Sequence, residues 1–437
     1  MIVPSIDLQN GHAVQLVGGK ERAIDAGDPR PIAEKFGRVG EIAVIDLDAA
    51  MGTGSNEETI RDLLRIAPCR VGGGIRSAER AIEWLDAGAR KVILGTAATP
   101  EVLRELPRER VIAAVDSRDG RVVDRGWTNA TGAGLEDKIA ELRDCVGGFL
   151  VTFVEIEGRM TGLPIERVKR VVELAGGAGG ARVTVAGGVR LARDIGEADR
   201  AGADTQVGMS LYSGTISLAE GFCAPLASDR PDGLWPTVVV DELGVCLGLV
   251  YSNLRSVHAS LESGRGVYWS RSRNELWEKG ATSGDTQELI RLEVDCDRDA
   301  LRATVRQAGS FCHTGTRGCF ESSATSPGPR GLGELERTIR ARLEAAPEGS
   351  YTKRLVTEPG LLRAKLMEEA GELAEAGTPG DAAWEAADVL YFALTKAVSA
   401  GARLEDIERH LDGRSLKVTR RKGDAKAPPP ANDGSTP

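Results

Sequence analysis

The sequence VGGGIRSAER at residues 71–80 returns in altered form as VAGGVRLARD at residues 185–194. Three further motifs repeat in the same order at nearly the same offset, about 110 residues. The pairs are IDLQNGHAV (6–14) with VDSRDGRVV (115–123), IDLD (45–48) with VEIE (154–157), and ILGTA (93–97) with QVGMS (206–210). Four ordered matches at nearly one offset indicate a unit that is built from two similar halves.

Short apolar segments alternate with helix-length segments throughout this repeated unit. The expected strands cover residues 2–6, 42–47, 70–71, 91–94, 111–115, 149–154, 182–186 and 204–207. Eight strands that are separated by helices are typical of a closed, parallel (β/α)8 barrel. We therefore expect such a barrel over residues 1–224.

Two further units follow the expected barrel. Residues 228–322 contain strand-like runs and a Gly-rich segment with cysteines, which predicts a mostly-β or α+β domain. Residues 334–421 are rich in Ala, Leu, Glu and Arg, which predicts an all-α domain. The Pro/Gly-rich residues 323–333 are typical of a linker, and residues 422–437 predict a disordered tail.

Composition narrows the class of protein. The 437 residues carry a formal net charge of −9, whereas nucleic-acid-binding proteins usually present a basic surface. We find no apolar run near the roughly 20 residues that a membrane-spanning helix needs, so we expect no membrane segment. The seven cysteines are an odd, scattered set, which favours thiols or metal ligands in a reducing cytoplasm over a disulfide framework.

Two aspartates occupy the functional end of the expected barrel, where strands finish at their carboxyl ends. Asp7 follows the first strand and Asp116 follows the fifth, which places them on opposite sides of the barrel mouth. Two carboxylates that face each other across a pocket can divide the acid and base roles if their surroundings separate their pKa values.

Glycines follow the third, fourth, seventh and eighth strands, where their backbone N–H groups can bind phosphate. They are Gly73, Gly74, Gly95, Gly187, Gly188 and Gly208. Two such cradles related by the repeat imply a substrate with a phosphate at each end. The simpler alternative is that these glycines only form tight turns and that the aspartates cap helices, and the fourfold repetition argues against it.

The barrel motifs resemble a known family. VPSIDLQNGHAVQL, VIDLDAA, VGGGIRS, VDSRDGRV and the pair Gly126-Trp127 resemble the phosphoribosylformimino-AICAR ribotide isomerases of histidine biosynthesis. The resemblance implies an Amadori rearrangement of an aminoaldose without a metal or organic cofactor. It implies Asp116 as the acid that opens the ribose ring and Asp7 as the base that takes the C2 proton. The segment 154–158 departs from the bacterial Thr-Asp pattern and is closer to the eukaryotic form.

The middle unit carries a concentrated set of metal-ligand types in RLEVDCDRDA (291–300) and FCHTGTRGCF (311–320). Three thiols leave a tetrahedral zinc ion one open position, which is typical of a catalytic site that makes hydroxide near neutral pH. The carboxylates are hard oxygen ligands suited to magnesium, and the histidine could shuttle a proton. These residues are Cys296, Cys312 and Cys319 for zinc, Asp295, Asp297 and Asp299 for magnesium, and His313.

If the first of these motifs lies on a strand, Cys296 points to one face while Asp295 and Asp297 point to the other. The simpler alternative is that the cysteines are ordinary buried residues and that the acidic run caps a helix. Three cysteines within 24 residues, together with three aspartates and a histidine, make that alternative less favoured.

This unit resembles phosphoribosyl-AMP cyclohydrolase along its full length, in RPDGLWPTVVVD, CLGLVYSN, GRGVYWSRSRNELWEKGATSGDTQ and the cysteine motifs. The resemblance implies hydrolysis of the purine ring between N1 and C6. It also implies a homodimer, because the active site in this family is assembled across a dimer interface. Implied contacts to the phosphates or base come from Ser270, Arg271, Ser272, Arg273 and residues 280–284.

The helical unit contains KLMEEAGE (365–372) and WEAAD (384–388). Spacings of three and four place carboxylates on one helix face, where like charges repel unless a cation is shared. The predicted magnesium ligands are Glu368, Glu369, Glu372, Glu385 and Asp388. The alternative is a solvated acidic face with Lys365 as a partner. With SYTKRL, these motifs resemble phosphoribosyl-ATP pyrophosphohydrolase, which implies release of pyrophosphate from a magnesium-bound triphosphate.

The three resemblances agree, because they describe three consecutive steps on phosphoribosyl nucleotides. We therefore expect a multifunctional histidine-biosynthesis enzyme that uses Zn²⁺ and Mg²⁺. Two alternatives stay open: a bifunctional enzyme with a catalytically silent barrel, and a nucleotide-binding regulator with decayed sites. The last two units also resemble the front of a larger protein that continues into a histidinol dehydrogenase, an activity that we do not expect here.

Overall fold

The computed structural model describes residues 1–19, 21–124, 127, 129–322 and 330–420. Gly126, the tail at 422–437 and most of the expected linker lie outside the described residues. Eight parallel strands form the amino-terminal region, each paired with two others, so that the sheet closes on itself. They are β1 (Ile2–Gln9), β4 (Ile42–Asp46), β5 (Cys69–Gly72), β6 (Lys91–Leu94), β7 (Val111–Arg118), β10 (Gly148–Phe153), β11 (Arg182–Ala186) and β12 (Ala203–Val207). The prediction of a (β/α)8 barrel is confirmed.

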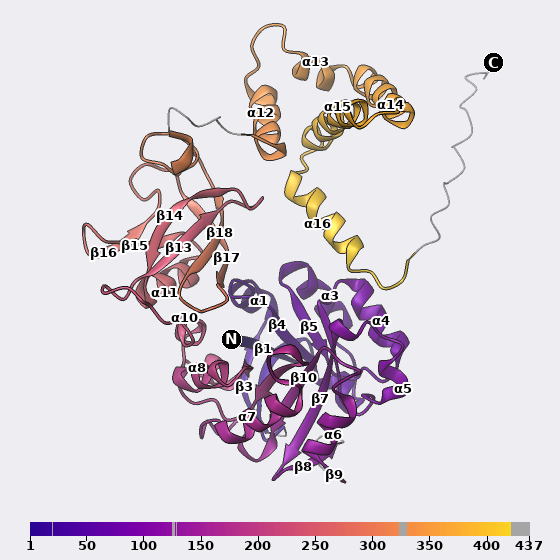
Figure 1. Ribbon diagram of the computed structural model, residues 1–437, viewed down its shortest axis with the longest axis vertical. Helices are drawn as coiled ribbons and strands as arrows, with labels where there is room; N and C mark the ends of the chain where they lie inside the picture. Colours follow the sequence, from indigo (N-terminus) through magenta and orange to yellow (C-terminus); the bar gives the residue numbers. More distant parts are fainter. Residues whose placement is uncertain (20, 125–126, 128, 323–329, 421–437) are drawn as a thin grey trace, which may run out of the picture.

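Helices cover the outside of the barrel (Figure 1). The helices of this region are α1 (Pro29–Gly37), α2 (Leu47–Met51), α3 (Glu57–Ile66), α4 (Ala78–Ala87), α5 (Pro100–Leu103), α6 (Leu135–Leu142), α7 (Ile165–Leu174), α8 (Ala192–Arg200), α9 (Met209–Tyr212) and α10 (Leu218–Cys223). Strand residues alternate between two cores because successive side chains point to opposite faces. Val92 and Leu94 pack into the large outer core, whereas Ile93 joins Ile112 and Leu150 in a separate cluster.

A hairpin follows the first strand of each half-barrel. The pair β2 (His12–Val17) and β3 (Glu21–Gly27) extends from β1, and the pair β8 (Arg121–Asp124) and β9 (Asn129–Gly134) extends from β7. These hairpins were not among the predicted strands, although their first strands begin within the repeated motif. They stand at the carboxyl ends of β1 and β7, where Asp7 and Asp116 lie.

The middle region is an α+β structure. Its four-stranded sheet has the order β14 (Cys246–Ser252), β13 (Trp235–Val240), β18 (Leu301–Gln307) and β17 (Gln287–Val294). A separate hairpin joins β15 (Val267–Ser270) to β16 (Glu275–Glu278), and α11 (Leu254–Ser263) packs beside it. The prediction of a mostly-β or α+β region is confirmed.

The carboxyl-terminal region is helical, as predicted. Its helices are α12 (Leu332–Glu344), α13 (Tyr351–Thr357), α14 (Pro359–Glu375), α15 (Pro379–Ser399) and α16 (Leu404–Ser415). In Figure 1, α16 leads from the other helices back towards the barrel, where the Asp86 carboxylate accepts the backbone N–H of Val418 at 2.7 Å. Within the described residues, every helix is too short or too polar to cross a membrane.

Candidate functional sites

The barrel mouth holds Asp7 and Asp116 at the ends of opposite strands. The Ser5 hydroxyl donates to Asp7 Oδ1 at 3.0 Å, and the Trp127 indole N–H donates to Asp116 Oδ2 at 2.8 Å. Burial raises the pKa of Asp7 to about 6, although the Ser5 bond opposes the shift. Burial also raises the pKa of Asp116, against hydrogen bonds from Thr152 and Trp127. Both carboxyls are therefore closer to neutrality than ordinary aspartates.

A third carboxyl, Glu157, joins them from the segment after β10. Its Oε2 is buried and has no hydrogen-bond partner among the described residues. Burial and the nearby charges of Asp7 and Asp116 raise the pKa of Glu157 to about 7. Glu157 was not among the predicted site residues, although its segment was identified as a repeat and as a departure from the bacterial pattern. The available signal was the match of VEIE to IDLD, which repeats the acids of the first half-barrel.

The glycines of the second half-barrel line a cavity beside these carboxyls. Asp7, Gln15, Glu157, Gly187, Gly188 and Gly208 all contribute to its wall. Gly187 has a positive φ of 89°, and a Cβ there would lie 2.6 Å from Glu157 Oε2. Glycine at this position therefore lets the loop after β11 pack directly against the third carboxyl.

The glycines of the first half-barrel pack in the equivalent way but do not line this cavity. A Cβ on Gly73 would lie 2.2 Å from the Asp46 carbonyl oxygen, and one on Gly74 would lie 2.6 Å from Ala49 Cβ. A Cβ on Gly95 would meet nothing within 4 Å. The alternative in which the glycines serve the loop conformation is therefore correct in part, because the double glycines are required for loop packing in both halves of the barrel.

The acidic motif of the middle region forms a turn. The prediction that strand alternation would continue through this motif is wrong, because β17 ends at Val294. Asp295 Oδ1 accepts the backbone N–H groups of Asp299 and Ala300 at 3.0 and 3.2 Å, which closes the turn. The carboxylates of Asp295, Asp297 and Asp299 consequently lie within 4.8 Å of one another. The hydrogen bond with Asp295 and the charge of Asp297 raise the pKa of Asp299. Such a set fits a divalent cation with oxygen ligands.

Two of the three predicted zinc ligands are neighbours. Hydrogen bonds from Thr314 lower the pKa of Cys312 to about 7, whereas burial and the neighbouring Cys312 raise the pKa of Cys319 to about 11. Cys246, which the sequence analysis did not select, also interacts with Cys319. His313 is exposed, with Nδ1 3.9 Å from Cys312 Sγ.

Cys296 does not complete this thiol pair within one chain. Among the described residues, Cys296, Cys312 and Cys319 do not bring their sulfurs within 4.8 Å of one another. Thiolates around one zinc ion need sulfur separations of about 4 Å. A single chain therefore offers two of the three expected thiol ligands at one place.

The predicted substrate-contacting residues 270–273 lie at the end of β15 and in the turn before β16, whereas the predicted residues 280–284 follow β16. The Arg271 guanidinium stacks over the Tyr251 ring, 3.8 Å from its centroid. Arg273 pairs with Glu275 at 3.0 Å, and the hydroxyls of Ser270 and Ser272 are 3.4 Å apart.

Helices α14 and α15 bring three carboxylates together. Glu369, Glu385 and Asp388 offer oxygens within 4.8 Å of one another, which fits a divalent cation. Burial and the neighbouring Glu372 and Glu369 raise the pKa of Glu385.

Glu368 is directed elsewhere. It pairs with Lys365 at 3.0 Å and is 51% exposed, and it does not belong to the three-carboxylate group. Lys365 also contacts Glu369 at 2.6 Å. The lysine partner that was expected for a solvated acidic helix face is therefore present at the edge of the three-carboxylate group.

Comparisons with known proteins assign families to three successive regions. Residues 1–217 match the histidine biosynthesis protein family, residues 248–321 match phosphoribosyl-AMP cyclohydrolase, and residues 332–415 match phosphoribosyl-ATP pyrophosphohydrolase.

Individual relatives agree with these families. A histidine biosynthesis trifunctional protein of Neurospora crassa is 55% identical over 214 residues, which is 49% of this chain and 24% of the relative. A histidine biosynthesis bifunctional protein of Schizosaccharomyces pombe is 53% identical over 212 residues, covering 48% of this chain and 49% of the relative. The chain thus spans about a quarter to a half of these fungal relatives.

A phosphoribosyl imidazole-4-carboxamide isomerase of Gemmatimonas aurantiaca is 37% identical over 239 residues, covering 51% of this chain and 99% of the relative. The match covers almost the whole isomerase, and the three family regions follow one another in order. The chain therefore belongs to the histidine biosynthesis protein family, with cyclohydrolase-type and pyrophosphohydrolase-type regions after its barrel.

Proposed function

We propose that this chain catalyses three consecutive steps of histidine biosynthesis. The helical region hydrolyses phosphoribosyl-ATP to phosphoribosyl-AMP and pyrophosphate, the middle region opens the purine ring, and the barrel isomerises the resulting aminoaldose to an aminoketose. The main support is that each family region contains its own cluster of carboxylates or thiols. The domain limits that we propose are 1–224, 228–322 and 334–421, with a linker at 323–333 and a tail at 422–437.

In the barrel, two carboxyls carry the proton transfers. Asp116 protonates the ring oxygen of the aldose as its bond to C1 breaks, and Trp127 holds this carboxyl in place. Asp7 then removes the C2 proton, and the resulting enolamine becomes the ketose when a proton adds to C1 and the C2 hydroxyl loses its proton. The cavity wall near Gly187, Gly188 and Gly208 supports phosphate binding in the second half-barrel. The packing of Gly73 and Gly74 in the first half supports an equivalent site for the second phosphate.

In the helical region, Glu369, Glu385 and Asp388 would hold magnesium, with Glu372 beside them. Magnesium there would neutralise charge on the triphosphate. In the middle region, the turn with Asp295, Asp297 and Asp299 would hold a second magnesium ion.

We propose a homodimer as the working form. The separation of Cys296 from Cys312 and Cys319 favours a zinc site to which a second copy contributes, because one chain does not supply the three thiols together. Exposed apolar side chains on α14 and α15 add an unpartnered surface: Met367 is 67% exposed and Trp384 is 72% exposed. We place the enzyme in the cytoplasm, because its odd, scattered cysteines favour a reducing compartment.

Product analysis tests this proposal. The purified chain is supplied with phosphoribosyl-ATP, Mg²⁺ and Zn²⁺, and the products are separated by chromatography, since the aldose and ketose have equal mass. Accumulation of the ketose is the expected result, and Asp7→Asn should stop the sequence at the aldose. Accumulation of the aldose by the unmodified chain would mean a catalytically silent barrel. Unchanged phosphoribosyl-ATP would contradict the pyrophosphohydrolase activity, and the two later steps are then checked by supplying phosphoribosyl-AMP and the aldose directly.

A further inference from the structure

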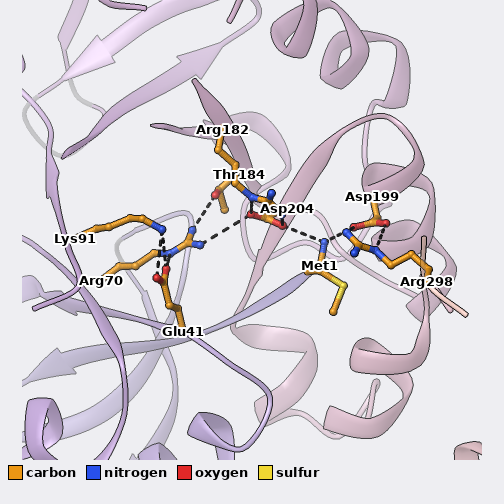
Figure 2. Close-up of polar contacts among 9 residues, drawn as sticks. All are labelled: Met1, Glu41, Arg70, Lys91, Arg182, Thr184, Asp199, Asp204 and Arg298. Atoms are coloured by element: carbon orange, nitrogen blue, oxygen red, sulfur yellow. Dashed lines mark hydrogen bonds and ion pairs between the residues drawn. The ribbon is translucent and has the colours of Figure 1, made fainter. Parts of the chain in front are cut away.

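Arg298 lies inside the acidic turn of the middle region, yet its side chain binds the barrel. Its Nε and Nη2 donate to the two carboxylate oxygens of Asp199 on α8, each at 3.1 Å (Figure 2). A guanidinium that binds a carboxylate through two parallel hydrogen bonds fixes orientation as well as distance. The turn with the three aspartates is thus attached to the barrel through one directed contact.

The barrel side of this contact is well supported. Asp199 is 11% exposed and also accepts from the Met1 amine at 2.7 Å, which in turn contacts Asp204. Burial would raise the pKa of Asp199, but the hydrogen bonds from Arg298 and Met1 lower it overall, so the carboxylate stays charged. Arg182 binds Asp204 from the far side (Figure 2). The position of Asp199 is therefore fixed by contacts within the barrel that do not involve Arg298.

Arg298 also shapes the turn itself. Its Nη1 donates to the Asp295 carbonyl oxygen at 2.9 Å, and its own carbonyl oxygen accepts the backbone N–H of Ala227 at 2.8 Å. Its φ of 70° is uncommon for a residue with a side chain and persists only where the surroundings hold it. The contact with Asp199 is one of these supports.

We propose that Asp199 of the barrel is a positioning residue for the ring-opening site of the middle region. By fixing Arg298, it sets the relative positions of Asp295, Asp297 and Asp299. This inference rests on the function proposed above for the middle region. It gives the barrel a second role that does not depend on isomerisation: the site of one enzyme is held in shape by the fold of another.

The same interface provides a matched control. Lys35 on α1 pairs with Glu262 on α11 at 2.8 Å, and Glu262 is 44% exposed. This pair joins the barrel to the middle region but does not touch the acidic turn. Glu262→Gln therefore weakens a contact between the two regions without releasing Arg298, and an exposed pair of this kind contributes little to stability.

The test uses the full chain and its variants Asp199→Asn, Arg298→Lys and Glu262→Gln. Hydrogen exchange of the backbone amides at 295–300 reports directly on the turn. Ring opening of phosphoribosyl-AMP is measured over a Mg²⁺ titration, and isomerase activity is measured alongside. For Asp199→Asn and Arg298→Lys, we expect faster exchange and a rise of about 10-fold in the Mg²⁺ concentration for half-maximal ring opening. Isomerase activity should stay within about twofold, and Glu262→Gln should behave like the unmodified chain.

Three results would overturn the inference. The first is unchanged exchange and Mg²⁺ requirement in Asp199→Asn. The second is an equal change in Glu262→Gln, which would indicate general loosening of the interface. The third is parallel loss of all three activities with a lower melting temperature. An unmodified chain without ring-opening activity would refute the function proposed for the middle region, and hydrogen exchange would still decide whether Asp199 holds the turn.

Discussion

Asp7 and Asp116 lie four strands apart in either direction around the closed barrel, at equivalent places in its two halves. Their hydrogen-bond partners break this symmetry. A hydroxyl from Ser5 on the same strand serves Asp7, whereas the indole of Trp127 serves Asp116. The duplicated fold therefore supplies two carboxyls, and the unlike partners allow them to take unlike roles.

Isomerase activity should fall on the acid side of pH 6. Asp7 acts as a base only when it is ionised, and burial raises the pKa of Asp7 to about 6. The value of kcat/KM should drop about tenfold for each pH unit below that value, and a pH profile from 5 to 9 checks this. Constant activity down to pH 5 would contradict the role of Asp7 as the base.

Glu157→Gln should reduce the rate without moving this acid limb. The pKa of Glu157, about 7, lies above that of Asp7, about 6, so Glu157 is largely neutral where Asp7 titrates and an amide in its place leaves the pKa of Asp7 unchanged. Because Glu157 lines the cavity beside Asp7, we expect a loss of about 10-fold in kcat with the acid limb in place. The matched control is Glu155→Gln on the same segment, because Glu155 pairs with Arg167. Equal effects of the two variants would show that only the loop conformation matters.

Whether a site residue of the barrel could be predicted from the sequence depends on what fixes its position in the fold. Asp7 and Asp116 could be placed from the sequence, because a residue at the end of a barrel strand has a fixed position. Glu157 could not, because its position depends on how a loop packs against Gly187, a contact between segments 30 residues apart. The short apolar segments correctly gave the strands, since parallel barrel strands are buried on both faces.

The same distinction holds in the middle region. Alternation failed at Asp295 because its side chain binds two backbone N–H groups, which competes with strand pairing. Cys296 was grouped with Cys312 and Cys319 by closeness in sequence alone. The β18 strand lies between them and separates their positions in one chain.

Asp7→Asn should stabilise the barrel above pH 6 while abolishing isomerisation. A carboxyl with a raised folded-state pKa stabilises the fold at low pH, and this contribution is lost as pH rises through the folded value, here about 6. At pH 8 the ionised Asp7 therefore costs about 3 kcal/mol, which the neutral amide avoids. Calorimetry should show a melting transition several degrees higher at pH 8 and a smaller gain at pH 5. A lower melting temperature at pH 8 would mean that the Ser5 bond outweighs the burial of charge.

Glu385→Gln should cost pyrophosphate release far more than Glu368→Gln. Glu385 lies with Glu369 and Asp388, whereas Glu368 pairs with Lys365 outside that group. Removing one ligand of a cation that neutralises transition-state charge should lower kcat by about 100-fold or more. Glu368→Gln should stay within about threefold, because an exposed ion pair contributes little. Release of pyrophosphate from phosphoribosyl-ATP is measured over a Mg²⁺ titration. A chelator should abolish it in the unmodified chain, and raised Mg²⁺ should restore Glu385→Gln only in part. Similar losses in both variants would mean that Glu368 also holds the cation, against its place outside the three-carboxylate group.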